Sequence, residues 1–276
     1  MHVTMLVAIV LLLAVTLAVA EPLPTPRRET FNCTADGSKW PYLVQDSPGP
    51  AEGILVNLHG HYSDETQMMT EGIYKDAFGK LRRECLRRNW VYVTAWYGGN
   101  TWMGPLGEAG LADLIGVLRK RWPKVPVYLQ GGSMGGSSVL VFAVRRPDLI
   151  DGVAARCPAG DIAAYYDWAL ARAAGNPTLR SITDAIRLHY TCDGHDLRQE
   201  LELRSALRHA DRLTMPVSLA HGSADTLIPV DWTRQLAERL RTLGRRVQYE
   251  EVEGGGHDST VDSVDWAKVL DFLSGK

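Results

Sequence analysis

Four short, largely apolar runs predict buried strands along this chain. They lie at 54–58, 91–95, 125–129 and 217–220, and the segment 247–252 is also strand-like. Apolar residues that follow one another without alternation are typical of a strand covered on both faces. We therefore expect a sheet with helices on both sides.

Helix-like stretches alternate with these strands. They span 70–88, 106–122, 135–146, 231–243 and 261–273. This alternation predicts an α/β fold with a mostly parallel, doubly wound sheet, in which sites gather at the carboxyl ends of the strands. The stretch 159–212 interrupts the alternation with aromatic residues among helical patterns. We expect it to be a helical cap inserted between two strands.

Composition narrows the classes of partner. The chain has 276 residues, 45% of them hydrophobic, with 30 Lys and Arg against 32 Asp and Glu. This length supports one domain with a sizeable core, and two full domains would be cramped. The nearly balanced charge lacks the basic surface that nucleic acids require. We expect no nucleic-acid partner and a neutral or small substrate.

The first 20 residues resemble an export signal. The segment 5–20 carries no charge and ends in Ala18-Val19-Ala20, a small-residue cleavage pattern. It is short for a membrane span, which needs about 20 apolar residues, but no Lys or Arg precedes it, so an uncleaved anchor is the alternative. We expect cleavage after Ala20 and a secreted or periplasmic protein without stable membrane association. An extended lead-in at 21–39 would precede the main domain at 40–276.

The four cysteines leave two alternatives open. Cys33, Cys85, Cys157 and Cys192 would allow two disulfides in three pairings in an exported chain. The alternative is that two or more of them are buried free thiols. None has the spacing of a zinc site, so we expect no metal.

The segment Gly131-Gly132-Ser133-Met134-Gly135 carries the clearest chemical signal. It follows a predicted strand and opens a helical stretch, which is the context of a nucleophile elbow. Such a turn strains the backbone of the serine, and the outer glycines avoid clashes there. The alternative is a glycine-rich turn without chemistry. We predict that Ser133 is the nucleophile.

A serine hydroxyl needs a base, and the base needs an acid that orients it. Asp225 follows the strand at 217–220, and His257 lies in a glycine-rich loop before the last helical stretch. The order Ser, Asp, His is that of alpha/beta-hydrolases. We predict that Asp225 and His257 complete a triad with Ser133, with Asp231 and Asp258 as alternative acids.

The tetrahedral oxyanion of acyl transfer needs two backbone N–H donors. One is expected from Met134, the residue after the nucleophile. The second is expected from the loop after the first apolar run, where we favour the amide of His61 over that of Tyr62.

Aromatic residues near the expected site are candidates for substrate binding. Tyr62, Trp96, Tyr97 and Trp102 lie in loops that follow predicted strands, and such rings stack on sugars or phenolic groups. Packing within the core is the alternative for them.

These motifs together resemble alpha/beta-hydrolases of the prolyl oligopeptidase and carbohydrate-esterase type. The resemblance rests on Leu58-His59-Gly60, the elbow at 131–136, His221-Gly222-Ser223-Ala224-Asp225 and Gly255-Gly256-His257, and covers roughly 40–273. It implies an acyl-enzyme mechanism without metal or organic cofactor. It does not fix the substrate.

The expected activity is a secreted serine esterase acting on short acyl esters of the acetyl or feruloyl type, with a small molecule or a carbohydrate as the alcohol. Peptide-cleaving prolyl oligopeptidases generally carry a large N-terminal propeller, for which this chain has no room. A small exported peptidase and a polyester or lipid hydrolase are the alternatives.

Overall fold

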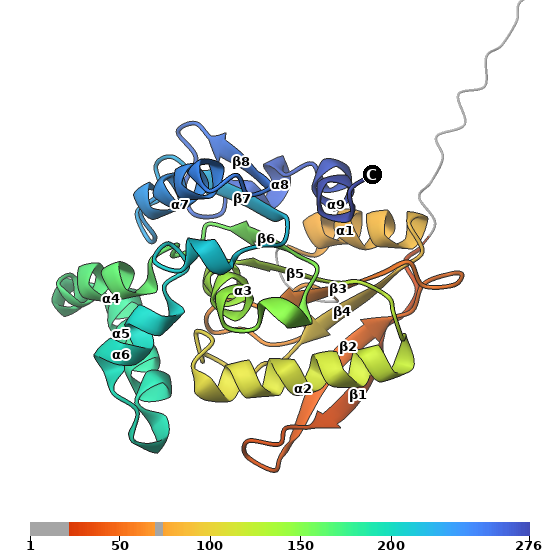
Figure 1. Cartoon of the computed structure of the whole chain (residues 1–276), viewed down its shortest axis with the longest axis horizontal. Coiled ribbons are helices and arrows are strands. Elements are labelled where there is room, and N and C mark those ends of the chain that lie inside the picture. The colour runs from red at the N-terminus through yellow and green to blue at the C-terminus, as the bar shows by residue number, and fades with distance from the viewer. Residues whose placement is uncertain (1–21, 70–73) are drawn as a thin grey trace, which may run out of the picture.

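A mostly parallel sheet forms the centre of the molecule (Figure 1). The computed structural model describes residues 22–69 and 74–276, so the predicted signal at 1–20 lies outside the described residues. The strands in chain order are β1 (Arg27–Asn32), β2 (Lys39–Gln45), β3 (Gly53–Leu58), β4 (Trp90–Ala95), β5 (Val127–Gly132), β6 (Gly152–Arg156), β7 (Val217–Gly222) and β8 (Val247–Val252). Across the sheet they run β1-β2-β4-β3-β5-β6-β7-β8. Only β2 is antiparallel to its neighbours β1 and β4 among the described strands, so the predicted α/β class is confirmed.

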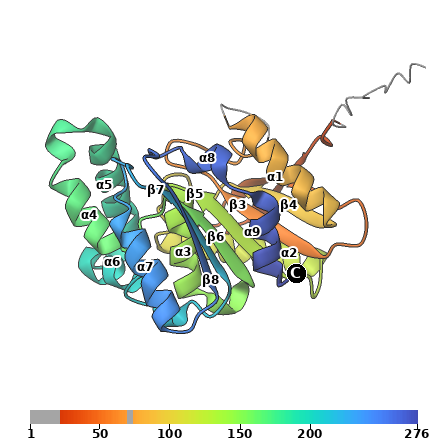
Figure 2. The same cartoon turned by 90° about the horizontal axis from the view of Figure 1, so that it is seen from above.

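Helices cover both faces of this sheet (Figure 2). They are α1 (Lys75–Arg87), α2 (Pro105–Arg121), α3 (Met134–Arg145), α4 (Ile162–Leu170), α5 (Pro177–Tyr190), α6 (Leu197–Arg204), α7 (Asp231–Thr242), α8 (Thr260–Ser263) and α9 (Trp266–Ser274). Helices α1 and α9 pack on one face, and α2, α3 and α7 on the other. Adjacent strand residues enter different cores: Leu55 faces α1 and α9, and Val56 faces α2 and α3. Helices thus exclude solvent from both faces of the sheet, which explains why the strand sequences are continuously apolar.

The fold begins earlier than we expected. The predicted lead-in at 21–39 contains β1, which pairs antiparallel with β2 from Arg27 opposite Val44 to Asn32 opposite Lys39. Its sequence is mostly polar because it is an edge strand, and only Phe31 is buried from it. Charged residues protect such an edge from pairing with other chains. The domain therefore starts at Arg27 rather than near residue 40.

The last predicted helix is interrupted. The stretch 261–273 contains the end of α8 and most of α9, separated by extended backbone at Val264 and Asp265. The Asp265 carboxylate accepts a hydrogen bond from the amide of Lys268 at 3.2 Å and so caps the start of α9. An aspartate in this position favours a new helix N-terminus over continuation of the preceding turn.

Helices α4, α5 and α6 lie between β6 and β7 in the chain, over the segment that we expected to form a cap. They stand together at one end of the molecule, away from α1 and α9 (Figure 1). No helix among the described residues is long and apolar enough to cross a membrane.

Three of the cysteines are thiols buried in the core. Cys33, Cys85 and Cys157 form no disulfide, which rules out two bridges among the four cysteines. The Cys192 sulfur donates a hydrogen bond to the carbonyl of His189 at 3.3 Å. Of the two alternatives, the structure therefore has buried thiols.

A buried carboxylate ties the cap to the sheet domain. Glu108 on α2 accepts hydrogen bonds from Arg204 of α6 at 2.6 Å and from Arg146, after the end of α3, at 2.7 Å. Burial by itself would raise the pKa of Glu108, but the hydrogen bonds from Arg146 and Arg204 outweigh it and lower the pKa to about 2. The carboxylate is therefore charged at neutral pH.

Glu108→Gln is expected to lower the free energy of unfolding by about 3 kcal/mol, because the buried Arg204 then keeps only Glu200 as a counterion and the charge-assisted hydrogen bonds to Glu108 are lost. Since the pKa of Glu108 is lowered from 4.5 to about 2, this contribution is present above about pH 4.5 and is lost as the pH falls through about 2. Urea unfolding at pH 7 measures the effect. Asp167→Asn is the matched control, because its ion pair with Arg198 is exposed and should contribute less than about 1 kcal/mol. Equal effects of the two changes would contradict the assignment.

Candidate active site

Ser133 lies in a sharp turn between β5 and α3. Its φ of 57° and ψ of −122° lie in a region that side chains other than glycine rarely adopt, as in a strained nucleophile elbow. A Cβ atom on Gly131 would lie 2.3 Å from the carbonyl carbon of Gly135, and one on Gly135 would lie 2.1 Å from the oxygen of Leu58. Both outer glycines are therefore required sterically. The Ser133 amide donates to the carbonyl of Arg156 at 2.9 Å, which fixes the turn against β6.

The structure brings Ser133, His257 and Asp225 into one hydrogen-bonded chain. The Nε2 atom of His257 is 2.8 Å from Ser133 Oγ, and its Nδ1 atom is 2.7 Å from Asp225 Oδ2. Asp225 follows β7 and His257 follows β8, so all three side chains lie at the carboxyl edge of the parallel sheet. Because the carboxylate accepts the proton on Nδ1, Nε2 is left to accept the hydroxyl proton of Ser133.

The Asp225 carboxylate is fully buried and held by several donors. Its Oδ1 atom accepts from the amides of Leu227 and Ile228 at 2.8 and 2.9 Å. Burial would raise its pKa, but the hydrogen bonds from His221 and His257 dominate and hold the pKa of Asp225 well below its usual range. The acid of the chain is therefore ionised throughout the neutral range.

His221 is a contact of the triad that the sequence did not reveal. Its Nε2 atom lies 3.1 Å from Asp225 Oδ2 and 2.9 Å from the carbonyl oxygen of Ile228. A carbonyl only accepts, so Nε2 carries a proton and donates toward both oxygens. The only signal in the sequence is the position of His221 near the end of the strand that precedes Asp225, four residues before it.

The alternative acids lie elsewhere. Asp258 accepts a hydrogen bond from the Tyr74 hydroxyl at 2.9 Å, and Asp231 pairs with Arg234 on the surface of α7. Neither forms a hydrogen bond with His257 among the described residues. Asp225 is thus the carboxylate in position to orient this imidazole.

The geometry of the loop after β3 favours His61 over Tyr62 as an oxyanion donor. The amide of Gly60 donates to Gln67 Oε1 and that of Tyr62 to Asn100 Oδ1, both at 2.8 Å. The amides of His61 and Met134 have no acceptor within the described part of the chain. Both are therefore free to donate to a developing oxyanion.

The His61 side chain fixes this loop. Trp102 Nε1 donates to its Nδ1 atom at 3.3 Å, and its Nε2 atom lies 3.1 Å from Ser181 Oγ on α5 of the cap. An indole only donates, so the proton is on Nε2. Burial, with a smaller contribution from His59, lowers the pKa of His61 to about 4, and the ring is neutral at pH 7. The cap thus supports the loop that carries the second predicted donor.

The structure corrects most of the predicted substrate-binding aromatics. Tyr97 and Trp102 are buried, and the Tyr97 hydroxyl donates to the carbonyl of His59. Trp96 packs edge-on against Trp40, beside the β2 end of the sheet. Tyr97 packs against the His59 ring and Trp102 stacks on Tyr165 of α4, whereas Trp96 is half-buried. Tyr62 alone is exposed, with 67% of its surface accessible.

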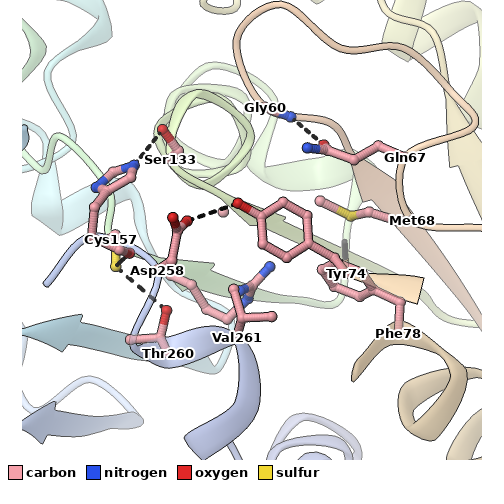
Figure 3. Close-up of a pocket in the computed structure, with 13 residues that line it drawn as sticks. Gly60, Gln67, Met68, Tyr74, Phe78, Ser133, Cys157, Asp258, Thr260 and Val261 are labelled. Carbon is pink, nitrogen blue, oxygen red and sulfur yellow. Dashed lines mark hydrogen bonds between the residues drawn. The ribbon is translucent and has the colours of Figure 1, made fainter. Parts of the chain in front are cut away.

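A small pocket opens beside Ser133, on the α1 side of the site (Figure 3). It encloses about 60 Å³. Its walls come from the loop after β3, the start of α1, the end of β6 and the segment 257–261, and no described cap residue lines it. Figure 3 shows the Tyr74 hydroxyl directed at Asp258, with Ser133 at the edge of the pocket. This volume suits a short acyl or alcohol group.

Donor atoms of Cys157, His221 and Asp225 lie within 4.8 Å of one another. The Cys157 sulfur donates to the carbonyl of His257 at 2.9 Å, and Asp225 is engaged by both histidines. The three side chains therefore lie close together because they make hydrogen bonds with residues of the triad.

Fold and site together define the class of protein: an alpha/beta-hydrolase with a serine at the nucleophile elbow. The chain matches the Peptidase_S9 model, the prolyl oligopeptidase family, over residues 124–275, more than half of its length. It therefore belongs to the prolyl oligopeptidase family of serine hydrolases, and the predicted resemblance is confirmed. A comparison with curated protein sequences found no match.

Solved structures with this fold include esterases and peptidases. Est1E from Butyrivibrio proteoclasticus aligns with a TM-score of 0.66 and 14% identity over 90% of this chain and 99% of its own. The Pyrococcus furiosus esterase Pf2001 aligns with a TM-score of 0.65 and 14% identity, over 91% of this chain and 90% of its own. A puromycin-hydrolyzing peptidase of Mycobacterium tuberculosis aligns with a TM-score of 0.65 and 18% identity over 89% of this chain. This chain spans only 38% of that peptidase. At these identities the likeness concerns the fold.

Proposed function

We propose that the protein is a serine esterase that hydrolyses short acyl esters through an acyl-enzyme. The observation that carries the proposal is the continuous hydrogen-bonded chain from Ser133 Oγ through His257 to the buried Asp225 carboxylate. Ser133 acts as nucleophile, His257 as general base and then acid, and Asp225 orients the imidazole.

In the first half of the reaction, Ser133 Oγ forms a bond to the ester carbonyl carbon and its proton passes to His257 Nε2. The carbonyl oxygen becomes an oxyanion that accepts hydrogen bonds from the amides of Met134 and His61. The intermediate collapses, the bond to the alcohol oxygen breaks, and the alcohol leaves with the proton from His257. Water then repeats these steps on the acyl-serine and releases the acid.

Several features support an ester over a peptide. The pocket beside Ser133 is small, and an alkoxide leaves more readily than an amine, so an ester needs less binding energy from remote contacts. Two solved esterases, Est1E and Pf2001, align with this chain over at least 90% of both chains. The burial of Tyr97 and Trp102 takes two of the four predicted rings away from the aromatic support for a carbohydrate alcohol. The family match keeps a small serine peptidase as the second candidate.

A panel of acetyl, butyryl and long-chain nitrophenyl esters, methyl ferulate and an aminoacyl-proline amide tests this proposal. We expect kcat/KM for the acetyl ester to exceed that for the long-chain ester and the amide by at least about tenfold, which corresponds to about 1.4 kcal/mol of transition-state binding. The small pocket and the weaker amine leaving group are the reasons. A tenfold preference for the amide would instead assign the protein to the peptidases.

A further inference from the structure

Arg156 is a buried cation beside the reacting serine. It is the last residue of β6 and is only 5% exposed. Its carbonyl holds the Ser133 amide, and its side chain lines the pocket that contains Ser133 and His257. A Cβ atom on Gly132 would lie 2.9 Å from Arg156 Nη2, so the guanidinium lies directly against the elbow.

The direct contacts of the guanidinium are with neutral groups, and Asp258 is a nearby charge without an ion pair to it. With the Gln130 amide oriented so that its nitrogen donates to Asn57, its oxygen accepts from Arg156 Nε at 3.0 Å and Nη2 at 3.2 Å. The rings of Phe78 and Trp266 lie 5.2 and 5.5 Å from the guanidinium carbon. No carboxylate of the described residues forms an ion pair with Arg156, and its Nη1 atom has no hydrogen-bond acceptor among them. The N–H groups of Nη1 are therefore available to donate hydrogen bonds to another acceptor.

The other buried arginines of the fold are satisfied differently. Arg204 pairs with Glu108 and Glu200. Arg82 also lacks an ion pair among the described residues, but its Nε, Nη1 and Nη2 atoms all donate, to Gln45 and to two backbone carbonyls. A buried cation without a counterion is costly, and such charges in proteins are normally paired. Arg156 differs from Arg204 because it has no ion pair, and from Arg82 because one N–H edge of its guanidinium is unused at a catalytic pocket, which points to an anion that binds there.

The remaining charges of the pocket limit what that anion is. Asp258 is the carboxylate in the lining, and it is exposed and hydrogen bonded to Tyr74 (Figure 3). Burial raises the pKa of Cys157, so this thiol is neutral. One guanidinium with an aspartate nearby suits a monoanion better than a phosphate dianion. Guanidinium groups bind carboxylates through charge-assisted N–H bonds.

We propose that Arg156 is a specificity-determining residue that binds a carboxylate on the substrate, so that the favoured esters carry a carboxylate a few atoms from the scissile carbonyl. This inference rests on the proposed esterase function. The carboxylate is bound in the ground state and in the transition state alike, so its effect falls mainly on KM. The small volume of the pocket confines the anion to a short substrate.

Two pairs of isosteric esters test the inference on either side of the scissile bond. Monomethyl succinate and its neutral isostere methyl levulinate place the group on the acyl side. O-acetylglycolate and acetoxyacetone place it on the alcohol side. In a pH-stat assay we expect one carboxylate ester to exceed its neutral isostere in kcat/KM by at least about tenfold, as expected for a charge-assisted hydrogen bond.

Arg156→Gln should reduce this ratio to about one or below, chiefly through KM. Arg156→Lys keeps the charge but loses the planar fork, so it should retain part of the ratio and serves as the informative variant if the glutamine variant does not fold. Arg82→Gln is the matched control, because Arg82 is also buried and hydrogen bonded to a glutamine but lies outside the pocket. It should leave the ratio at its wild-type value.

The outcomes separate the inference from the function. If wild type hydrolyses the neutral esters as well as their carboxylate isosteres, or if both Arg156 variants keep the wild-type ratio, the inference is wrong and the esterase proposal stands. If none of the four esters is hydrolysed, the function is wrong. Calorimetric titration of monomethyl succinate then tests the inference in two proteins, the Ser133→Ala variant and the double variant that also carries Arg156→Gln. The inference requires that the single variant binds monomethyl succinate and that the double variant does not.

Discussion

Ser133→Ala and Ser133→Gly are both expected to abolish ester hydrolysis, with kcat/KM lower by about 10⁴-fold to 10⁶-fold. Their stabilities should differ. The backbone of residue 133 has a φ of 57°, a strained conformation for alanine that glycine adopts without steric cost. We expect the glycine variant to be more stable than the alanine variant by about 1 kcal/mol, after allowance for its greater unfolded-state entropy. Urea unfolding of the two inactive proteins measures this difference.

A serine outside the site provides the control. Ser274 lies in the last turn of α9 and its hydroxyl donates to carbonyls of that helix, so Ser274→Ala should keep wild-type turnover. Covalent labelling by a serine-directed phosphonate should occur at Ser133 in wild type and disappear in both variants. Labelling at another serine, or substantial turnover by either variant, would refute the assignment of the nucleophile.

Asp225→Asn is expected to lower kcat by about 10⁴-fold, because the amide no longer fixes the tautomer of His257 or stabilises the imidazolium. The pKa of Asp225 is held below its usual range, so the residue stays ionised while activity is measured. The pH dependence of wild-type activity in the neutral range should therefore contain no contribution from titration of Asp225. A pH–rate profile with a short acyl ester measures both properties.

Asp231→Asn is the matched control for this change, because it removes an exposed carboxylate that the sequence also offered as the acid. Its kcat should stay within about threefold of wild type. A greater loss of kcat for Asp258→Asn than for Asp225→Asn would show that the wrong acid had been chosen. The lowered pKa of Asp225 also affects the free energy of unfolding. Because the folded pKa of Asp225 lies below its ordinary 3.8, its contribution is present above that pH and is lost on further acidification.

The sequence by itself determined the fold class and the three residues that the structure brings together at the candidate site. Strands that are buried on both faces produce apolar runs, and these can be recognised in the sequence without knowing which strands lie beside them. The elbow of Ser133 is a local device, since strand, turn and helix follow one another within a few residues and the clash of the outer glycines is built into that turn. The order of Asp225 and His257 after their strands follows from the same parallel topology.

Features that depend on contacts between distant segments could not be predicted from the sequence. β1 is a strand only because β2 pairs with it, since its own residues are mostly polar. Trp102 and Tyr97 looked like loop aromatics, and their burial was decided by helices that come later in the chain. Neither propensity nor periodicity reports which surface a loop residue meets.

The charges of the site show this division most clearly. An arginine at the end of a predicted strand and a histidine four residues before an aspartate are ordinary in a sequence. Arg156 becomes distinctive because β6 lies beside β5, which places its guanidinium against Gly132 without an ion pair to a described carboxylate. His221 forms a hydrogen bond with the Asp225 carboxylate because the turn after β7 brings Asp225 back beside it. The chain specified which groups are present, and the tertiary structure decided which of them are buried together, because the cost of burying a charge depends on the partners that folding brings within reach.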